Sequence, residues 1–230
     1  MQLRLLKKLF DVPQSVSSSF LFLELGVLPI EYEIQKRQLT FLHHIVNLDS
    51  NDPVRLLYDQ MKRLPCEANW VNDVRRSADK FSIEIDDEQL RTISKDTFKN
   101  TVKKAVEAFA FKKLQTECSQ QKKTQTLKYD HFRCQPYLTK LYPSQAKVIL
   151  KCRARCLKIK THRPFLFKNK ICRWCNLEEE SLEHVINCGS DDSMKVDVSI
   201  DDLGECDYDM ELRLTTLSGR INDFLDMVEI

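Results

Sequence analysis

The feature that most constrains the fold is a set of four potential metal ligands in the last third of the chain. Two residues separate Cys172 from Cys175, and three separate His184 from Cys188. Two cysteines at this spacing bind zinc from a tight turn, and a short helix beginning after Ser181 would place His184 and Cys188 on one face. Four protein ligands complete a tetrahedron. The pattern therefore predicts one structural Zn²⁺ site that stabilises folding and leaves no position for a catalytic water.

The remaining cysteines and histidines lack this spacing. Five thiols are predicted to be small core residues or solvent-accessible side chains: Cys66, Cys118, Cys134, Cys152 and Cys156. Two alternatives to the CCHC knuckle stay open. The two cysteine pairs can be fortuitous, or His162 or Cys206 can replace one of the four ligands, although both lie at poorer spacing.

Glycine is scarce, with four residues in the chain, so the tight hairpins of β folds lack their usual residue. Apolar residues instead recur at helical spacing between prolines. We therefore predict a mostly α protein with a helical, bundle-like body. The predicted ranges are the helical body at 1–120, a basic helix with a zinc-binding knuckle at 127–189, an acidic connector at 190–209 and an amphipathic C-terminal helix at 210–230.

The segment that leads into the zinc motif is strongly basic. Residues 131–177 contain no acidic residue and 12 Lys or Arg. A helix beginning near Ser144 would place Lys147, Lys151, Arg155 and Lys158 on one ridge. Such a ridge suits contact with a phosphate backbone, and Trp174 can stack on a base. The residues predicted to bind nucleic acid are Lys147, Lys151, Arg153, Arg155, Lys158, Lys160, Arg163, Arg173 and Trp174.

The partner predicted from this pattern is RNA or DNA, as a single strand or a template–primer. Neutralising a backbone carries no base information, so sequence-specific readout is not implied. The alternative is that the cations form an ordinary solvated face and that Trp174 packs on the knuckle.

Charge is segregated along the chain. Residues 190–230 hold 12 acidic and three basic residues, whereas the remaining 189 residues hold 33 basic and 22 acidic ones. A basic body favours a polyanionic partner.

The C-terminal residues carry an apolar stripe: Leu214, Leu217, Ile221, Phe224, Leu225 and Val228. We expect this helix to pack on the body of the same chain. The alternative is a protein–protein interaction module, with a protein partner or self-association through residues 210–230.

No catalytic constellation is recognisable. The acidic groups at 86–88 and 201–202 are explained by helix starts and solvation, and the histidines at 43 and 44 by a structural role. A nuclease that uses the acidic tail is a weaker alternative. We also expect no signal peptide and no membrane span, hence reduced thiols in an intracellular protein, with nucleus and cytoplasm not distinguished.

Two segments resemble a known family. The zinc motif CRWCNLEEESLEHVINC closely resembles the knuckle near the C-terminus of reverse transcriptases from non-LTR (LINE-like) retrotransposons. The segment LELGVLPIEYEIQKRQLTFLHHIVN, at residues 23–47, resembles the helical region downstream of the polymerase core in those proteins. The resemblance implies that Cys172, Cys175, His184 and Cys188 bind zinc and that the basic stretch before them holds template RNA or target DNA.

The chain also departs from this family. The aromatic-x-Asp-Asp motif of the polymerase palm is absent, since the acidic pairs at 86–87 and 201–202 directly follow Ile85 and Ile200. Some relatives carry an endonuclease after the knuckle, whereas here Lys195 is the sole lysine beyond it. We therefore expect a C-terminal fragment or remnant that binds nucleic acid and neither polymerises nor cuts it.

Overall fold

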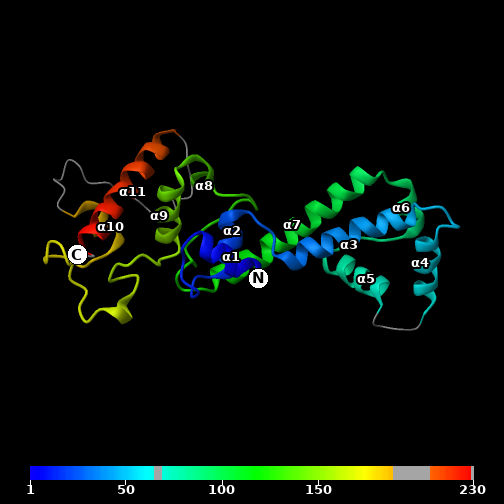
Figure 1. Cartoon of the computed structure of the whole chain (residues 1–230), viewed down its shortest axis with the longest axis horizontal. Coiled ribbons are helices and arrows are strands. Elements are labelled where there is room, and N and C mark those ends of the chain that lie inside the picture. Colours follow the sequence, from blue (N-terminus) through cyan, green and yellow to red (C-terminus); the bar gives the residue numbers. More distant parts are fainter. Residues whose placement is uncertain (65–68, 189–207, 229–230) are drawn as a thin grey trace. The chain divides into compact units, whose positions relative to one another are not determined.

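A computed structural model of the chain describes residues 1–64, 69–188 and 208–228 (Figure 1). These residues form eleven α-helices, one 3₁₀-helix and no β-strand, which confirms the predicted mostly α fold. In chain order the helices are α1 (Gln2–Leu9), α2 (Ser18–Leu25), α3 (Ile30–Val46), α4 (Pro53–Arg63), α5 (Trp70–Lys80), α6 (Asp87–Thr92), α7 (Lys95–Ser119), α8 (Pro136–Lys140), α9 (Pro143–Arg153), η1 (Pro164–Leu166), α10 (Leu182–Asn187) and α11 (Tyr208–Val228).

Local sequence signals explain where several helices begin and end. Side-chain oxygens of Ser17, Asp52 and Asp86 accept hydrogen bonds from backbone amides in the first turns of α2, α4 and α6. At the end of α2, Gly26 adopts a left-handed conformation with φ 59°. A Cβ there would lie 2.3 Å from the backbone nitrogen of Cys134, so only glycine allows these two backbone segments to approach.

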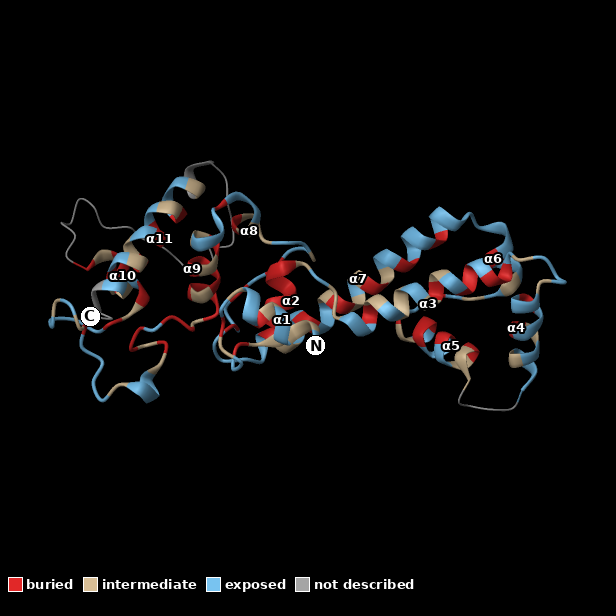
Figure 2. Cartoon of the chain, viewed as in Figure 1, coloured by how far each residue is buried: buried red, intermediate tan, exposed pale blue. Residues whose placement is uncertain are grey.

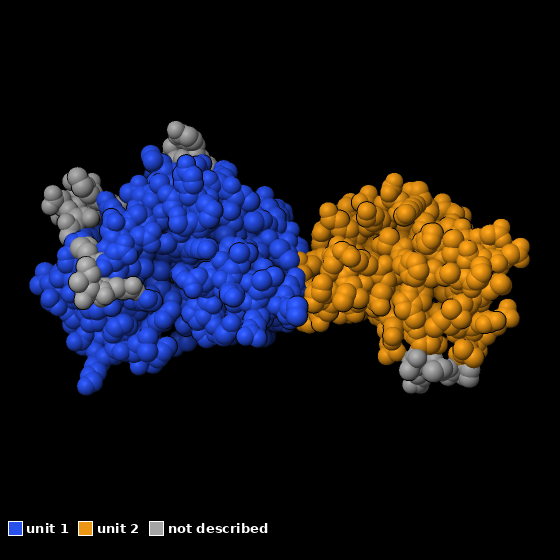
Figure 3. Space-filling view, in the orientation of Figure 1, with its two compact units in different colours: residues 1–27, 114–230 blue, residues 28–113 orange. Residues whose placement is uncertain are grey.

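The chain forms two compact units (Figure 3). Unit 1 contains Met1–Val27 and Leu114–Ile230, and unit 2 contains Leu28–Lys113. This division differs from the predicted ranges, which placed the first 120 residues in one body. The first two helices instead belong to the unit that holds the zinc motif.

Unit 2 is built around α3, which packs against α4, α5 and α6. Its core residues recur at helical spacing, with Leu39, Leu42 and Val46 on α3 and with Phe98, Val102 and Val106 on α7. Figure 2 shows buried segments recurring along both helices. The rings of Tyr32, Phe81 and Phe109 meet edge to face. His43 is buried, stacks on Phe98 and hydrogen-bonds the carbonyl oxygen of Ile93 at 2.9 Å. These contacts give His43 the structural role expected of it.

A buried carboxylate joins distant segments of unit 1. Glu24, at the end of α2, is fully buried, and its Oε1 accepts hydrogen bonds from Arg153 Nε at 2.8 Å and from the Tyr129 hydroxyl at 2.7 Å. Its Oε2 accepts a hydrogen bond from the Tyr137 hydroxyl at 2.7 Å. The backbone follows the same pairing, because the Gln135 amide donates to the Glu24 carbonyl oxygen at 2.9 Å. Residues 1–27 are therefore attached to the C-terminal half of the chain by a buried ion pair.

The C-terminal helix α11 packs against α9 and α10 of the same chain. Leu214, Leu217, Ile221 and Phe224 of the predicted stripe are buried. Packing on the body of the chain, the expectation for this helix, is therefore confirmed for these side chains. Most of the predicted acidic connector lies outside the described residues, as do Asp201, Asp202 and Cys206.

Across residues 1–64, 69–188 and 208–228, no helix combines the length and the apolar character that crossing a membrane requires.

Candidate metal centre

The structure brings the four predicted ligands together. The donor atoms of Cys172, Cys175, His184 and Cys188 all lie within 4.8 Å of one another. The sulfurs of Cys172 and Cys188 are 3.8 Å apart, and Cys175 Sγ lies 3.3 Å from His184 Nε2. His162, the alternative ligand, is not part of this cluster. Three sulfurs and one imidazole nitrogen converging in this way could hold a metal ion.

A tight turn and a short helix supply the ligands. The turn over residues 171–179 is closed by a hydrogen bond of 2.7 Å from the Cys172 amide to the Glu178 carbonyl oxygen, and Asn176 provides its left-handed residue with φ 57°. Ser181 then caps α10, since its hydroxyl oxygen accepts a hydrogen bond from the His184 amide at 3.1 Å. The capped helix carries His184, and Cys188 follows its last residue, as the spacing predicted.

The surroundings of the donor atoms favour metal binding. Backbone amides of Leu177 and Glu178 lower the pKa of Cys175 to about 6, so this thiol ionises easily. Burial and the neighbouring Cys172 raise the pKa of Cys188 to about 12. A bound cation would oppose that burial effect, because it stabilises the thiolate form. Nδ1 of His184 lies 3.1 Å from a Glu178 carboxylate oxygen, a contact that orients a metal-binding imidazole.

A second buried carboxylate holds the turn in place. Glu180 is fully buried and accepts hydrogen bonds from the Arg173 guanidinium at 2.8 and 3.0 Å and from the Lys160 and Arg173 amides at 3.0 Å. Lys160 is also buried, and its ammonium donates to Asn169 and to the Ile171 carbonyl oxygen. Two of the cations predicted to contact nucleic acid therefore make bonds that shape the knuckle.

The predicted basic ridge is only partly formed. Helix α9 ends at Arg153, so Arg155 and Lys158 do not continue the face that carries Lys147 and Lys151, and the expectation of one helical ridge is wrong. Arg155 has φ 47°, and the amides of residues 155 and 156 donate to the carbonyl oxygens of residues 152 and 151. These bonds form a Schellman ending, in which a left-handed residue closes the helix.

The prediction that Arg153 binds nucleic acid is also corrected. It is 1% exposed and bonded to Glu24, so it cannot reach a phosphate on a ligand. Its neighbour on α9, Lys151, forms an ion pair with Asp11 at 2.6 Å. Arg163 donates to the carbonyl oxygen of Cys156 at 2.9 Å. Half of the side chain of Trp174 is exposed, and its ring centre lies 6.1 Å from that of Phe224 on α11.

A cleft of about 470 Å³ lies beside the start of α10 in unit 1. Lys122, Lys123 and Arg155 line it together with His162. Among the described side chains of this cleft, Arg155 Nε and His162 Nδ1 are buried nitrogens without a hydrogen-bond partner. The two lysines were not predicted, because they belong to a polar run that resembles a linker.

His162 makes the stability of unit 1 depend on pH. Burial and the nearby Arg155, Lys123 and Arg163 lower its pKa to about 3. The unfolded chain, with a His pKa of about 6.5, therefore binds more protons than the folded chain between pH 6.5 and 3. We expect this contribution to be complete above pH 6.5 and to fall by up to about 1.4 kcal/mol per pH unit below it.

Urea unfolding of the wild type and of His162→Gln from pH 7.5 to pH 5 measures this effect. The variant removes the titrating ring, so its stability should fall less on acidification, and the difference between the two chains cancels other acid-sensitive groups. Parallel pH profiles would contradict the prediction.

Comparisons of the chain with protein-family models, with curated proteins and with solved structures find no match. The resemblance to the C-terminal region of non-LTR reverse transcriptases therefore rests on the motifs in the sequence and stays a prediction.

Proposed function

We propose that the chain is a zinc-stabilised nucleic-acid-binding protein, related to the C-terminal region of non-LTR retrotransposon reverse transcriptases. The observation that carries the proposal is the position of the Cys172, Cys175, His184 and Cys188 cluster at the end of a segment with 12 cations and no carboxylates over residues 131–177. A segment of this charge attracts a polyanion, and the metal site fixes the shape of its end.

Two donor separations support zinc as the metal. At a Zn–S distance of about 2.3 Å, two sulfurs of a tetrahedral site lie about 3.8 Å apart. The sulfurs of Cys172 and Cys188 have this separation of 3.8 Å. The same geometry, with Zn–N of about 2.0 Å, places sulfur and nitrogen about 3.5 Å apart, close to the 3.3 Å between Cys175 and His184. Thiolate and imidazole ligands select zinc over magnesium or calcium.

The cleft beside α10 is the best candidate for phosphate contact in unit 1. Lys122, Lys123 and Arg155 line it and supply three cations against one acidic lining residue, Glu183. Lysine and arginine side chains neutralise phosphate oxygens and release their counterions. We therefore propose that nucleic acid contacts this cleft, with Lys158 and Trp174 as further exposed residues of the basic segment.

The alternative function, an interaction module that uses residues 210–230, has weaker support. This alternative was based on the apolar stripe of the C-terminal helix, and four residues of that stripe are buried within the chain. A partner would have to displace α11 from α9 and α10 to reach them. Binding of nucleic acid requires no such rearrangement.

Fluorescence anisotropy with labelled single-stranded RNA, single-stranded DNA and duplex DNA tests the proposal. We expect binding at 50 mM salt that weakens steeply as salt rises, since counterions are released from the phosphates. Lys122→Gln/Lys123→Gln should lower the log–log salt slope on single strands by about 1.4 and weaken binding at least about fivefold.

The matched control is Arg4→Gln/Lys8→Gln, which removes the same charge from exposed positions of α1 in the same unit. Its binding should change much less than that of the Lys122 and Lys123 variant. Absence of binding to all three ligands at low salt would end the proposal, and equal losses in both variants would remove the cleft from it.

A further inference from the structure

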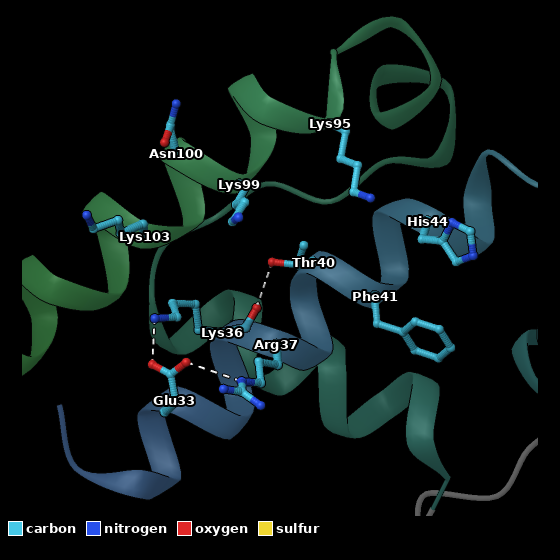
Figure 4. A pocket seen from close by; sticks show the side chains of 10 residues that line it. All are labelled: Glu33, Lys36, Arg37, Thr40, Phe41, His44, Lys95, Lys99, Asn100 and Lys103. Carbon is cyan, nitrogen blue, oxygen red and sulfur yellow. Dashed lines mark hydrogen bonds and ion pairs between the residues drawn. The ribbon is translucent and has the colours of Figure 1, made fainter.

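Unit 2 contains a cationic cleft outside the basic segment of residues 131–177. It has a volume of about 590 Å³ and lies between α3 and α7 (Figure 4). Lys36, Arg37 and Phe41 line it from α3, and Lys95, Lys99 and Lys103 line it from α7. We infer that this cleft binds the backbone of single-stranded nucleic acid, with Phe41 stacking on a base.

The lysines of α7 form a continuous ridge. Lys95, Lys99 and Lys103 are four residues apart and exposed, so they lie on one face about 6 Å from one to the next along the helix axis. Figure 4 shows Lys95 and Lys99 extending toward the α3 side of the cleft. Like charges at this spacing repel one another and destabilise a helix. A polyanion lying along the ridge would remove that repulsion.

Few acidic side chains lie near the cations of the cleft. Glu33 is the sole acidic side chain among its described lining residues, and it pairs with Lys36 at 2.5 Å and with Arg37 at 3.2 Å. Glu107 reaches Lys103 at 4.0 Å. Glu33 is thus shared by Lys36 and Arg37, and Lys95, Lys99 and Lys103 add three further cations to the lining, so the local charge is strongly positive.

Phe41 distinguishes this cleft from a site for any small anion. Its side chain is 49% exposed, and its ring packs edge-on against Trp70 at 5.9 Å and lies 6.1 Å from His44. These neighbours hold the ring in place and leave part of it available for stacking. A cationic groove with a fixed aromatic ring is the arrangement that binds single strands with little sequence preference.

This inference rests on the proposed function and extends it to a second surface, in the other compact unit. The decisive measurement is anisotropy of a labelled 20-nucleotide single strand with the full chain as a function of salt. Lys95→Gln/Lys99→Gln should weaken binding at least about fivefold and lower the salt slope by about 1.4. Phe41→Leu should weaken binding about fivefold or more, whereas Phe41→Tyr, which keeps the ring, should bind like the wild type.

Lys104→Gln/Arg91→Gln is the matched control, because it removes two exposed charges of unit 2 outside the lining of this cleft. If the Lys95 and Lys99 variant binds like this control while Lys122→Gln/Lys123→Gln still weakens binding, the inference fails and the proposed function stands. If the wild type does not bind, the proposed function fails first. Unchanged binding by Phe41→Leu, with polyglutamate competing as well as the oligonucleotide, would show a general polyanion surface and overturn the inference.

Discussion

Removal of the metal will unfold the knuckle over residues 170–188 and leave unit 2 folded. Helix α10 has only six residues, and helices shorter than about 12 are marginal in water. We therefore expect that its packing on α11 and the hydrogen bonds of Glu180 do not hold the knuckle without the cation. In zinc-finger peptides a structural zinc contributes an apparent 10–16 kcal/mol at pH 7. Without the cation, the buried sulfurs of Cys172 and Cys188 would also lack the ion that both of them bind.

Elemental analysis and hydrogen exchange test this prediction together. We expect one zinc ion per chain, lost on dialysis against a chelator and in Cys175→Ser. In both cases the amides of α10 should lose their protection, while those of α3 in unit 2 keep theirs. Cys134→Ser is the matched control, since Cys134 is an exposed cysteine outside the cluster. Retention of zinc and of α10 protection in Cys175→Ser would show that the ligand assignment is wrong.

The cluster of Cys172, Cys175, His184 and Cys188 was predictable because its determinants are local. The spacing of Cys172 and Cys175 specifies a turn, and Ser181 specifies the start of the helix that presents His184. Each choice involves residues within a few positions of one another. The contact between Glu178 and His184 could have been suspected from the acidic stretch before the histidine, but the sequence does not say which of its glutamates reaches the ring.

The structure of the basic segment was not predictable in the same way. Lysine and arginine side chains are expected to face solvent, and nothing near Arg153 in the sequence indicates that Glu24, 129 residues earlier, supplies its partner. The end of α9 was also hidden, because Arg155 occupies a left-handed position that glycine usually takes. The helical periodicity of the sequence therefore extends beyond the residue where the helix ends.

The division of the chain into two units was not predictable for the same reason. The predicted ranges separated residues 1–120 from residues 127–189, yet Glu24 bonds to Tyr129, Tyr137 and Arg153 across that boundary. Long-range contacts of this kind involve one residue on each segment and leave no periodic signal. They can be recognised only when the fold brings the segments together.

Loss of the Glu24 carboxylate should be the most damaging single change in unit 1. Glu24→Ala removes the carboxylate that pairs with Arg153, which is 1% exposed, and removes the acceptor of two buried tyrosine hydroxyls. Breaking a buried ion pair from one side costs about 3–5 kcal/mol. Urea unfolding in a Trp70→Phe background measures the effect, since the remaining Trp174 lies in unit 1 and reports on it alone.

Two controls separate the buried charge from other causes. Asp11→Asn removes the exposed ion pair with Lys151, which should cost less than about 1 kcal/mol. Glu24→Gln/Arg153→Met removes both buried charges and keeps a side-chain oxygen for the tyrosine hydroxyls, so it should be clearly more stable than Glu24→Ala. If the double variant is no more stable than Glu24→Ala, the destabilisation does not arise from breaking the Glu24–Arg153 ion pair. A Glu24→Ala chain as stable as Asp11→Asn would mean that this ion pair does not hold residues 1–27 on the C-terminal half of the chain.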